Sequence, residues 1–220
     1  MTFALLRRAP TPNPFPRLDS PSRGTSFAPV QNGPREIVLV RHGRPDLSRN
    51  VTLTSQGYRD WWTRYDSVGL KDGAVMPPRV RELVEGAARV ASSPLPRALE
   101  TARMSRDWEE PDHILPDMVE APLPPPDLGP LRFRPLTWGT ISRILWLAHH
   151  GHGSETAPQS RARAARVAGE LDSLTPGGRT VVFAHGWFNR SVGRALKRKG
   201  WHCEEGRGDS YWSFRRYVKD

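Results

Sequence analysis

Three short runs of apolar and β-branched residues stand out along this chain, each followed at once by polar side chains. The runs are residues 36–40 (EIVLV), 89–92 (RVAS) and 179–184 (RTVVFA). Short apolar runs of this kind are typical of strands buried on both faces. We therefore predict three buried strands. Residues 114–117 (ILPD) predict an edge strand, because proline cannot donate to a central ladder, and the alternation in residues 210–217 predicts a terminal strand.

The segments between these runs have the spacing and the end signals of helices. Thr54 or Ser55 can cap the first helix, and Pro78 suits the first turn of the second. A third helix follows the second strand and has Arg97 in its first turn. The other predicted bounds are 55–68, 78–88, 137–149, 158–174 and 187–199. The arginines of the helix over 158–174 are expected to form a solvated face.

Aromatic residues gather in the first predicted helix, at Trp61, Trp62 and Tyr65. Such residues can stack on nucleic-acid bases, but at helical spacing they more often pack in a core. Core packing is therefore the favoured explanation.

Each predicted buried strand ends near a cationic or ionisable side chain. Arg41 and His42 follow the first strand, Arg97 follows the second, and His185 follows the third. Ligands of open α/β sheets bind at the carboxyl ends of the strands. Gly43 would let backbone approach such a ligand closely. We therefore expect these four side chains to converge on one crevice.

Composition restricts the classes of protein and of partner. A chain of 220 residues suits one well-cored domain, and its formal net charge of +10 suits anionic partners. The single cysteine, Cys203, excludes an internal disulfide and a multi-cysteine zinc site, and its favoured role is that of a half-buried strand residue. No apolar run is long enough to span a membrane, and Met1–Leu6 is too short for a secretory signal, so a cytoplasmic protein is expected.

Two segments have a biased composition. Residues 1–34 are rich in proline and poor in periodic apolar residues, so we predict a disordered tail there, ahead of the alternative of a basic docking arm. The tract His149-His150-Gly151-His152-Gly153 suggests a metal site. It lacks carboxylate or cysteine partners at ligand spacing, and a loop is favoured.

Two arginines and two histidines in one crevice suit a dianionic phosphoryl group. Arg41 and Arg97 can clamp its oxygens with paired hydrogen bonds. One histidine can attack phosphorus if its attacking nitrogen is unprotonated, while the other stabilises the charge. A nearby carboxylic acid would protonate the departing alcohol and then activate water. These residues supply the positive charge, so no metal or other cofactor is expected.

The motifs LVRHG (39–43), SSPLPRALETA (92–102) and AHG (184–186) together resemble the histidine phosphatase superfamily, also called the phosphoglycerate-mutase-like family. The resemblance covers residues 35–220. It implies a three-layer α/β/α sandwich with a mostly parallel central sheet. By motif match it makes His42 the phosphorylated nucleophile, with Arg41, Arg97 and His185 completing the phosphate pocket.

The resemblance leaves the proton donor open. Glu120 lies where many members place it, but a proline-rich stretch follows instead of the usual glycine-rich one. Glu155, in the segment GSET, is the competitor and resembles a family segment at the mouth of the site. Arg44 stands where many members have glutamate, so it is expected to make the substrate rim more basic.

The expected activity is hydrolysis of a phosphomonoester through a phosphohistidine on His42, and the substrate is a phosphorylated small molecule or a phosphoprotein. Within the family, a phosphoglycerate-type mutase, a phosphohistidine-protein phosphatase and a ribazole-phosphate phosphatase are alternatives. A pseudo-enzyme that binds phosphorylated ligands is another, whereas a nucleic-acid binder rests only on charge and tryptophans. No nucleic-acid or membrane partner is expected. Residues 44–52 and 120–138 should set the substrate, whose identity the sequence leaves open along with the oligomeric state.

Overall fold

The protein is described by a computed structural model over residues 34–121, 123–148, 155–206 and 208–220. The strands are β1 (Arg35–Arg41), β2 (Arg89–Ser92), β3 (His113–Ile114), β4 (Arg179–Ala184), β5 (His202–Glu205) and β6 (Phe214–Lys219). The helices are α1 (Ser55–Ser67), α2 (Pro78–Glu85), α3 (Pro96–Met104), α4 (Pro135–Leu147), α5 (Ala157–Leu174) and α6 (Gly186–Arg198), with a 3₁₀ turn at Pro116–Met118.

The described strands form one sheet in the order β3-β2-β4-β1-β6-β5. The strands β3, β2, β4 and β1 run parallel to one another, while β6 is antiparallel to β1 and β5 is antiparallel to β6. The prediction of a mostly parallel α/β sheet is therefore confirmed, with an antiparallel pair at one edge.

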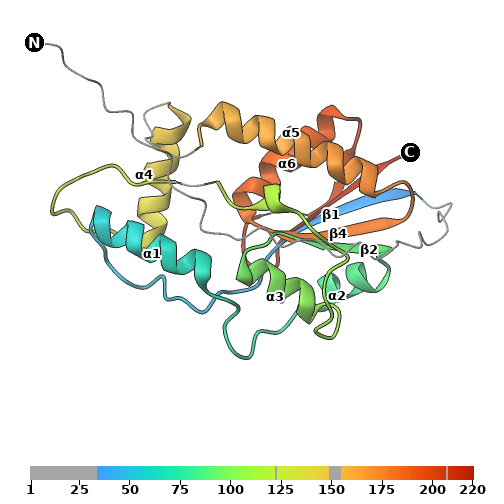
Figure 1. Ribbon diagram of the computed structural model, residues 1–220, viewed down its shortest axis with the longest axis horizontal. Helices are drawn as coiled ribbons and strands as arrows, with labels where there is room; N and C mark the ends of the chain where they lie inside the picture. The colour runs from blue at the N-terminus through green and yellow to red at the C-terminus, as the bar shows by residue number, and fades with distance from the viewer. Residues whose placement is uncertain (1–33, 122, 149–154, 207) are drawn as a thin grey trace, which may run out of the picture.

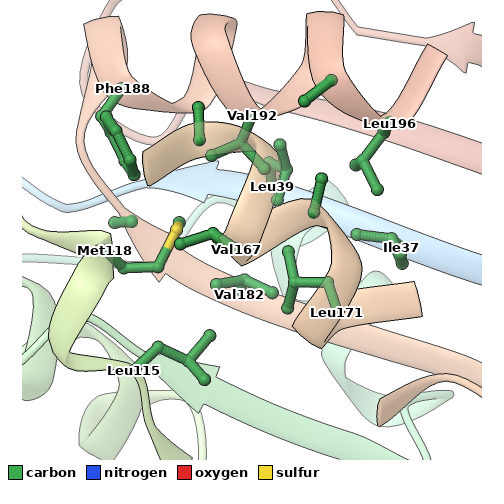
Figure 2. Close-up of a cluster of buried hydrophobic side chains, with 14 of the residues drawn as sticks. Ile37, Leu39, Leu115, Met118, Val167, Leu171, Val182, Phe188, Val192 and Leu196 are labelled. Carbon is green, nitrogen blue, oxygen red and sulfur yellow. The ribbon is translucent and has the colours of Figure 1, made fainter. Parts of the chain in front are cut away.

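Helices cover both faces of this sheet (Figure 1). Along β1, Ile37 and Leu39 pack against residues of α5 and α6, as Figure 2 shows. Val38 and Val40 point the other way and pack with residues of α2 and α3. The predicted three-layer sandwich is confirmed, and burial on both faces explains why β1 is continuously apolar.

A third apolar cluster lies beyond these layers, where α1 meets α4. Its buried members are Tyr58, Trp61 and Tyr65 from α1 and Trp138 from α4. The two helices lie at one end of the molecule, on the left in Figure 1. Core packing is confirmed for Trp61 and Tyr65, and Trp62 packs against the cluster partly buried.

Most predicted elements are present, with shifts at some ends. The bounds of β2 and β4 match the prediction, and Thr54 caps α1 by accepting a hydrogen bond from the Gly57 N–H at 3.2 Å. Helix α2 ends three residues earlier than predicted, because Gly86 caps it and Ala88 N–H already donates to the Arg179 carbonyl on β4. Cys203 is a half-buried residue of β5, as expected.

Three other expectations were wrong in part. The strand predicted over 114–117 is β3 followed by a 3₁₀ turn at Pro116. The terminal strand begins at Phe214, not at Ser210, because residues 210–212 form a turn. Arg163 of α5 is buried rather than solvated, and it donates to the carbonyls of Asp117 and Val119.

Two predictions lie outside the described residues. They are the disordered tail, apart from Pro34, and the histidine tract at 149–153. Among the residues that are described, none of the helices combines the length and apolar character needed to cross a bilayer.

Candidate active site

The two histidines come from neighbouring parallel strands at the same level of the sheet. Arg41 at the end of β1 pairs in register with Ala184 at the end of β4, and the His42 N–H donates to the Ala184 carbonyl at 2.9 Å. His42 and His185 therefore leave the sheet side by side, and their ring centroids are 5.2 Å apart. The carboxyl ends of β1 and β4 meet, as the sequence predicted, and they place the two histidines together.

The hydrogen bonds of His42 define its reactive nitrogen. Nδ1 lies 2.7 Å from the Gly43 carbonyl, which can only accept, so Nδ1 carries the proton. Nε2 is then an unprotonated acceptor, and Nε of Arg97 donates to it at 3.3 Å. Burial, aided by the positive charges of Arg97 and Arg41, holds the pKa of His42 well below its ordinary value. The ring is therefore neutral, with a lone pair on Nε2.

Gly43 is required by close packing at this strand end. A Cβ atom there would lie 2.6 Å from the indole of Trp212 and 3.0 Å from Leu70. The Gly43 N–H also donates to the Thr101 hydroxyl of α3 at 3.0 Å. Glycine thus lets the loop after His42 pass between these groups and holds the histidine at the strand end.

Arg97 is fully buried in the first turn of α3 and held from the end of α1. Its Nη1 donates to the Tyr65 carbonyl at 2.7 Å, and its Nη2 donates to Asp66 at 3.0 Å. The guanidinium carbon also lies 4.3 Å from the centre of the Tyr65 ring. These contacts determine the orientation of the guanidinium beside His42.

Arg41 is half-buried between the loop before β6 and the start of α6. Its Nη1 donates to the Asp209 carbonyl, and its guanidinium carbon lies 4.7 Å from the centre of the Tyr211 ring. Its Nε is buried without a hydrogen-bond partner among the described residues. Gly186 makes room for this side chain, since a Cβ there would lie 3.1 Å from Arg41 Cδ.

His185 is buried at the start of α6 and hydrogen-bonded to Ser93, with 2.9 Å between Nε2 and the hydroxyl oxygen. A hydroxyl that donates to Nε2 leaves the ring proton on Nδ1, which has no partner among the described residues. Burial and the charge of Arg97 hold the pKa of His185 well below its ordinary value. A neutral His185 can therefore offer an Nδ1–H donor to an incoming oxygen.

Glu120 lies at the N-terminus of α6. Its carboxylate accepts hydrogen bonds from the backbone N–H groups of Trp187 at 3.3 Å and Phe188 at 3.0 Å. Free N–H groups at a helix N-terminus favour an anion. Glu120 shares one cavity with Arg41, His42, Arg97 and His185.

Glu155 and Arg44 are placed differently. Both oxygens of Glu155 accept from the buried Arg163, each at 2.7 Å. Arg44 is exposed. Neither residue is among those that line the cavity, so the structure does not bring these two candidates to the expected positions.

The cavity has a volume of about 600 Å³ and continues well beyond the phosphate-sized end. Its outer part is walled by α1, α4 and the loop before β6. Arg49 belongs to the segment 44–52 that was expected to set the substrate. Several other lining residues were not predicted from the sequence: Tyr58, Trp61, Trp62, Tyr65, Arg143, Trp187, Asp209 and Tyr211. Among the described residues, no group of three or more His, Cys, Asp or Glu side chains is placed to hold a metal ion.

The model of the histidine phosphatase superfamily, branch 1, matches residues 37–207. The chain therefore belongs to that superfamily. No curated protein matches it significantly.

Several solved structures are similar to this chain at low sequence identity. Mycobacterial glucosyl-3-phosphoglycerate phosphatase in complex with VO3 is 20% identical with a TM-score of 0.51, over 74% of this chain and 82% of that one. A phosphoserine phosphatase mutant from Entamoeba histolytica, in complex with phosphoserine, is 17% identical with a TM-score of 0.46, over 74% and 80% of the two chains. The structure of a putative alpha-ribazole-5'-P phosphatase from Escherichia coli is 15% identical with a TM-score of 0.47, over 74% and 78% of the two chains.

Proposed function

We propose that this protein is a phosphomonoester hydrolase that forms a phosphohistidine on His42. The observation that carries the proposal is the geometry of that ring: it is buried, its Nδ1 lies 2.7 Å from the Gly43 carbonyl, and its Nε2 lies 3.3 Å from Nε of Arg97. An unprotonated imidazole nitrogen near two arginine guanidinium groups is suited to attack a phosphoryl group.

In the first step, Nε2 of His42 attacks phosphorus and the ester P–O bond breaks. Arg41, Arg97 and the Nδ1–H of His185 stabilise the charge on the equatorial oxygens. The Gly43 carbonyl accepts from Nδ1–H of His42 and so stabilises the positive charge that the ring gains. These groups supply the positive charge that the transition state needs, and the proposed mechanism uses no metal.

Glu120 is the proposed proton carrier. The substrate binds as its monoanion and gives its proton to the carboxylate, which passes it to the departing alcohol oxygen. In the second step, water attacks phosphorus, the N–P bond breaks, and the water proton passes to Glu120. Inorganic phosphate takes this proton from Glu120 and leaves as its monoanion, which regenerates both His42 and the Glu120 carboxylate. Glu120 is preferred to Glu155 because it lines the cavity, whereas Glu155 is paired with Arg163.

Turnover of an aryl phosphate by the purified protein tests this proposal. Vanadate is the matched inhibitor, since it mimics a five-coordinate phosphoryl group. We expect vanadate-sensitive release of inorganic phosphate that is lost in His42→Ala. The absence of turnover in the wild-type protein would contradict the proposal.

A second candidate is a domain that binds phosphate esters without hydrolysing them. One observation favours it: the Glu120 carboxylate is already engaged by the backbone N–H groups of α6. Vanadate or phosphate binding in the absence of any turnover would identify this alternative.

A further inference from the structure

Two arginines of the cavity, Arg49 and Arg143, have no function in the proposed phosphate pocket, and they differ in their hydrogen-bond partners. Arg143 lies on α4 and lines the cavity together with the phosphate-binding end. Its guanidinium donates no hydrogen bond to an acceptor among the described residues, and its Nη1 is buried without a partner there. The other arginines of the cavity differ in this respect: Arg41 donates to the Asp209 carbonyl, Arg49 to the Tyr65 hydroxyl, and Arg97 to Tyr65 and Asp66.

The guanidinium of Arg143 is nevertheless held in place. Its carbon lies 3.8 Å from the centre of the Trp187 ring, at the start of α6. Stacking of this kind holds the cation while leaving its hydrogen-bonding edge free. Burial lowers the pKa of Arg143, and the charge of Glu120 opposes that effect. A half-buried cation without an acceptor is a site at which an anionic group of a ligand would be stabilised.

The surface around Arg143 is apolar. Leu136, Ile144 and Leu147 lie on the same face of α4, line the cavity, and are 71%, 62% and 48% exposed. Four aromatic residues of α1 line the same cavity: Tyr58, Trp61, Trp62 and Tyr65. Covering exposed apolar side chains with an apolar ligand group is favourable by about 25 cal/mol per Å². The part of the cavity that would receive the alcohol of a phosphate ester therefore combines apolar walls with one free cation among the described residues.

We infer that the substrate is a phosphomonoester whose alcohol has an apolar body and bears a second anionic group, which Arg143 binds. This inference rests on the proposed function, because the phosphate end of the cavity orients the substrate. The second group is a carboxylate or another phosphate, since both offer the paired oxygens that a guanidinium recognises. Arg143 is thus a specificity-determining residue.

The test compares two substrates that differ only in that charge. One is 3-(carboxymethyl)phenyl phosphate and the other is its primary amide, whose phenol is of similar acidity. We expect wild-type kcat/KM to favour the carboxylate by roughly tenfold, which corresponds to about 1.4 kcal/mol. In Arg143→Met, which keeps an unbranched apolar stem, the preference should fall below about twofold. Because the measurement is a ratio, a general loss of activity cancels.

Two further variants serve as controls. Arg134→Met removes the same charge from an exposed position just before α4, so it should keep the tenfold ratio. Arg143→Lys retains the charge without the planar fork and should keep part of the preference. Hexane-1,6-diol bisphosphate compared with hexyl phosphate gives the preference for a second phosphate, and the size of this ratio is set against that of the carboxylate and amide pair.

The outcomes separate this inference from the proposed function. Equal turnover of the carboxylate and the amide by the wild-type protein would overturn the inference and leave the phosphatase activity intact. A preference that persists in Arg143→Met would also overturn it. Equal losses of kcat/KM for both substrates in Arg143→Met, with a stronger dependence of the rate on leaving-group pKa, would also overturn it. Arg143 would then act through Glu120. If neither substrate is hydrolysed, calorimetric titration of the same pair into the wild-type protein and Arg143→Met decides the inference by the ratio of Kd values.

Discussion

Nε of Arg97 lies 3.3 Å from Nε2 of His42, and the other two nitrogens of the same guanidinium donate to the Tyr65 carbonyl and to Asp66. One side chain thus connects the end of α1 to the reactive nitrogen at the end of β1. The guanidinium keeps a positive charge against that nitrogen, which disfavours a proton there. The guanidinium also lies beside the position at which a phosphoryl group would be attacked.

Replacing Arg97 by lysine should damage catalysis severely although the charge is conserved. An ammonium group cannot reach the Tyr65 carbonyl, Asp66 and the phosphoryl oxygens in the same geometry. We expect kcat/KM for an aryl phosphate to fall by about 10²–10³-fold. Arg103→Lys, on the same helix but paired with Glu110 at the surface, is the matched control. A near-normal rate in Arg97→Lys would remove this residue from the pocket.

Variants of the two candidate acids, Glu120 and Glu155, should differ in how strongly their rates depend on the leaving group. Glu120→Ala should slow esters of weakly acidic alcohols by about 10²–10⁴-fold, and esters of acidic phenols much less, because the latter need no proton. The slope of log kcat/KM against leaving-group pKa measures this. Equal losses across the series would contradict a general-acid function for Glu120.

Glu155→Gln should lower the stability of the protein and leave the dependence of the rate on the leaving group unchanged. The substitution leaves Arg163 buried at 9% side-chain exposure without its carboxylate. Unfolding by urea should show a loss of stability on the order of 3 kcal/mol. The leaving-group slope should stay that of the wild-type protein, and a steeper slope would restore Glu155 as the acid.

Stability should depend on pH through the two buried histidines. Burial lowers the pKa of both His42 and His185 in the folded state. The unfolded chain binds their protons near pH 6.5, whereas the folded chain does not. The free energy of unfolding therefore falls as pH drops below about 6.5, by up to about 2.7 kcal/mol per pH unit for two protons, and this contribution is constant at higher pH.

Urea titrations between pH 5 and 8 measure that slope. His42→Ala removes one of the two groups, so below pH 6.5 its slope should be smaller than the wild-type slope by about 1.4 kcal/mol per pH unit. Identical slopes in the two proteins would show that His42 does not remain neutral in the folded state.

The sequence predicted those elements whose signal is local. Strands β2 and β4 are buried on both faces, so their apolar runs predicted their bounds, and the residues that follow the strand ends converge as parallel neighbours must. Strand β5 reads HCEE, which has no apolar run, and only Cys203 pointed to it. Its partner β6 begins later than its alternating pattern suggested.

The outer cavity could not be predicted, because its contacts join segments far apart in the chain. Arg41 meets the Asp209 carbonyl and Tyr211 through a turn before β6, and Tyr65 meets Arg97 across 32 positions. Likewise, the sequence shows α4 as apolar but does not show that Leu136 and Ile144 stay exposed at a cavity. Ser93 belongs to a recognisable motif, yet its bond to His185 depends on the packing of β2 beside β4.

In the proposed mechanism His42 carries the phosphoryl group during turnover. Rapid acid-free quenching of the wild-type protein with a ³²P-labelled aryl phosphate tests it most directly. We predict label that is stable to alkali, is lost in acid, maps to the peptide containing His42, and is absent from His42→Ala. Hydrolysis by the wild-type protein without any such label, or label that persists in His42→Ala, would contradict the account.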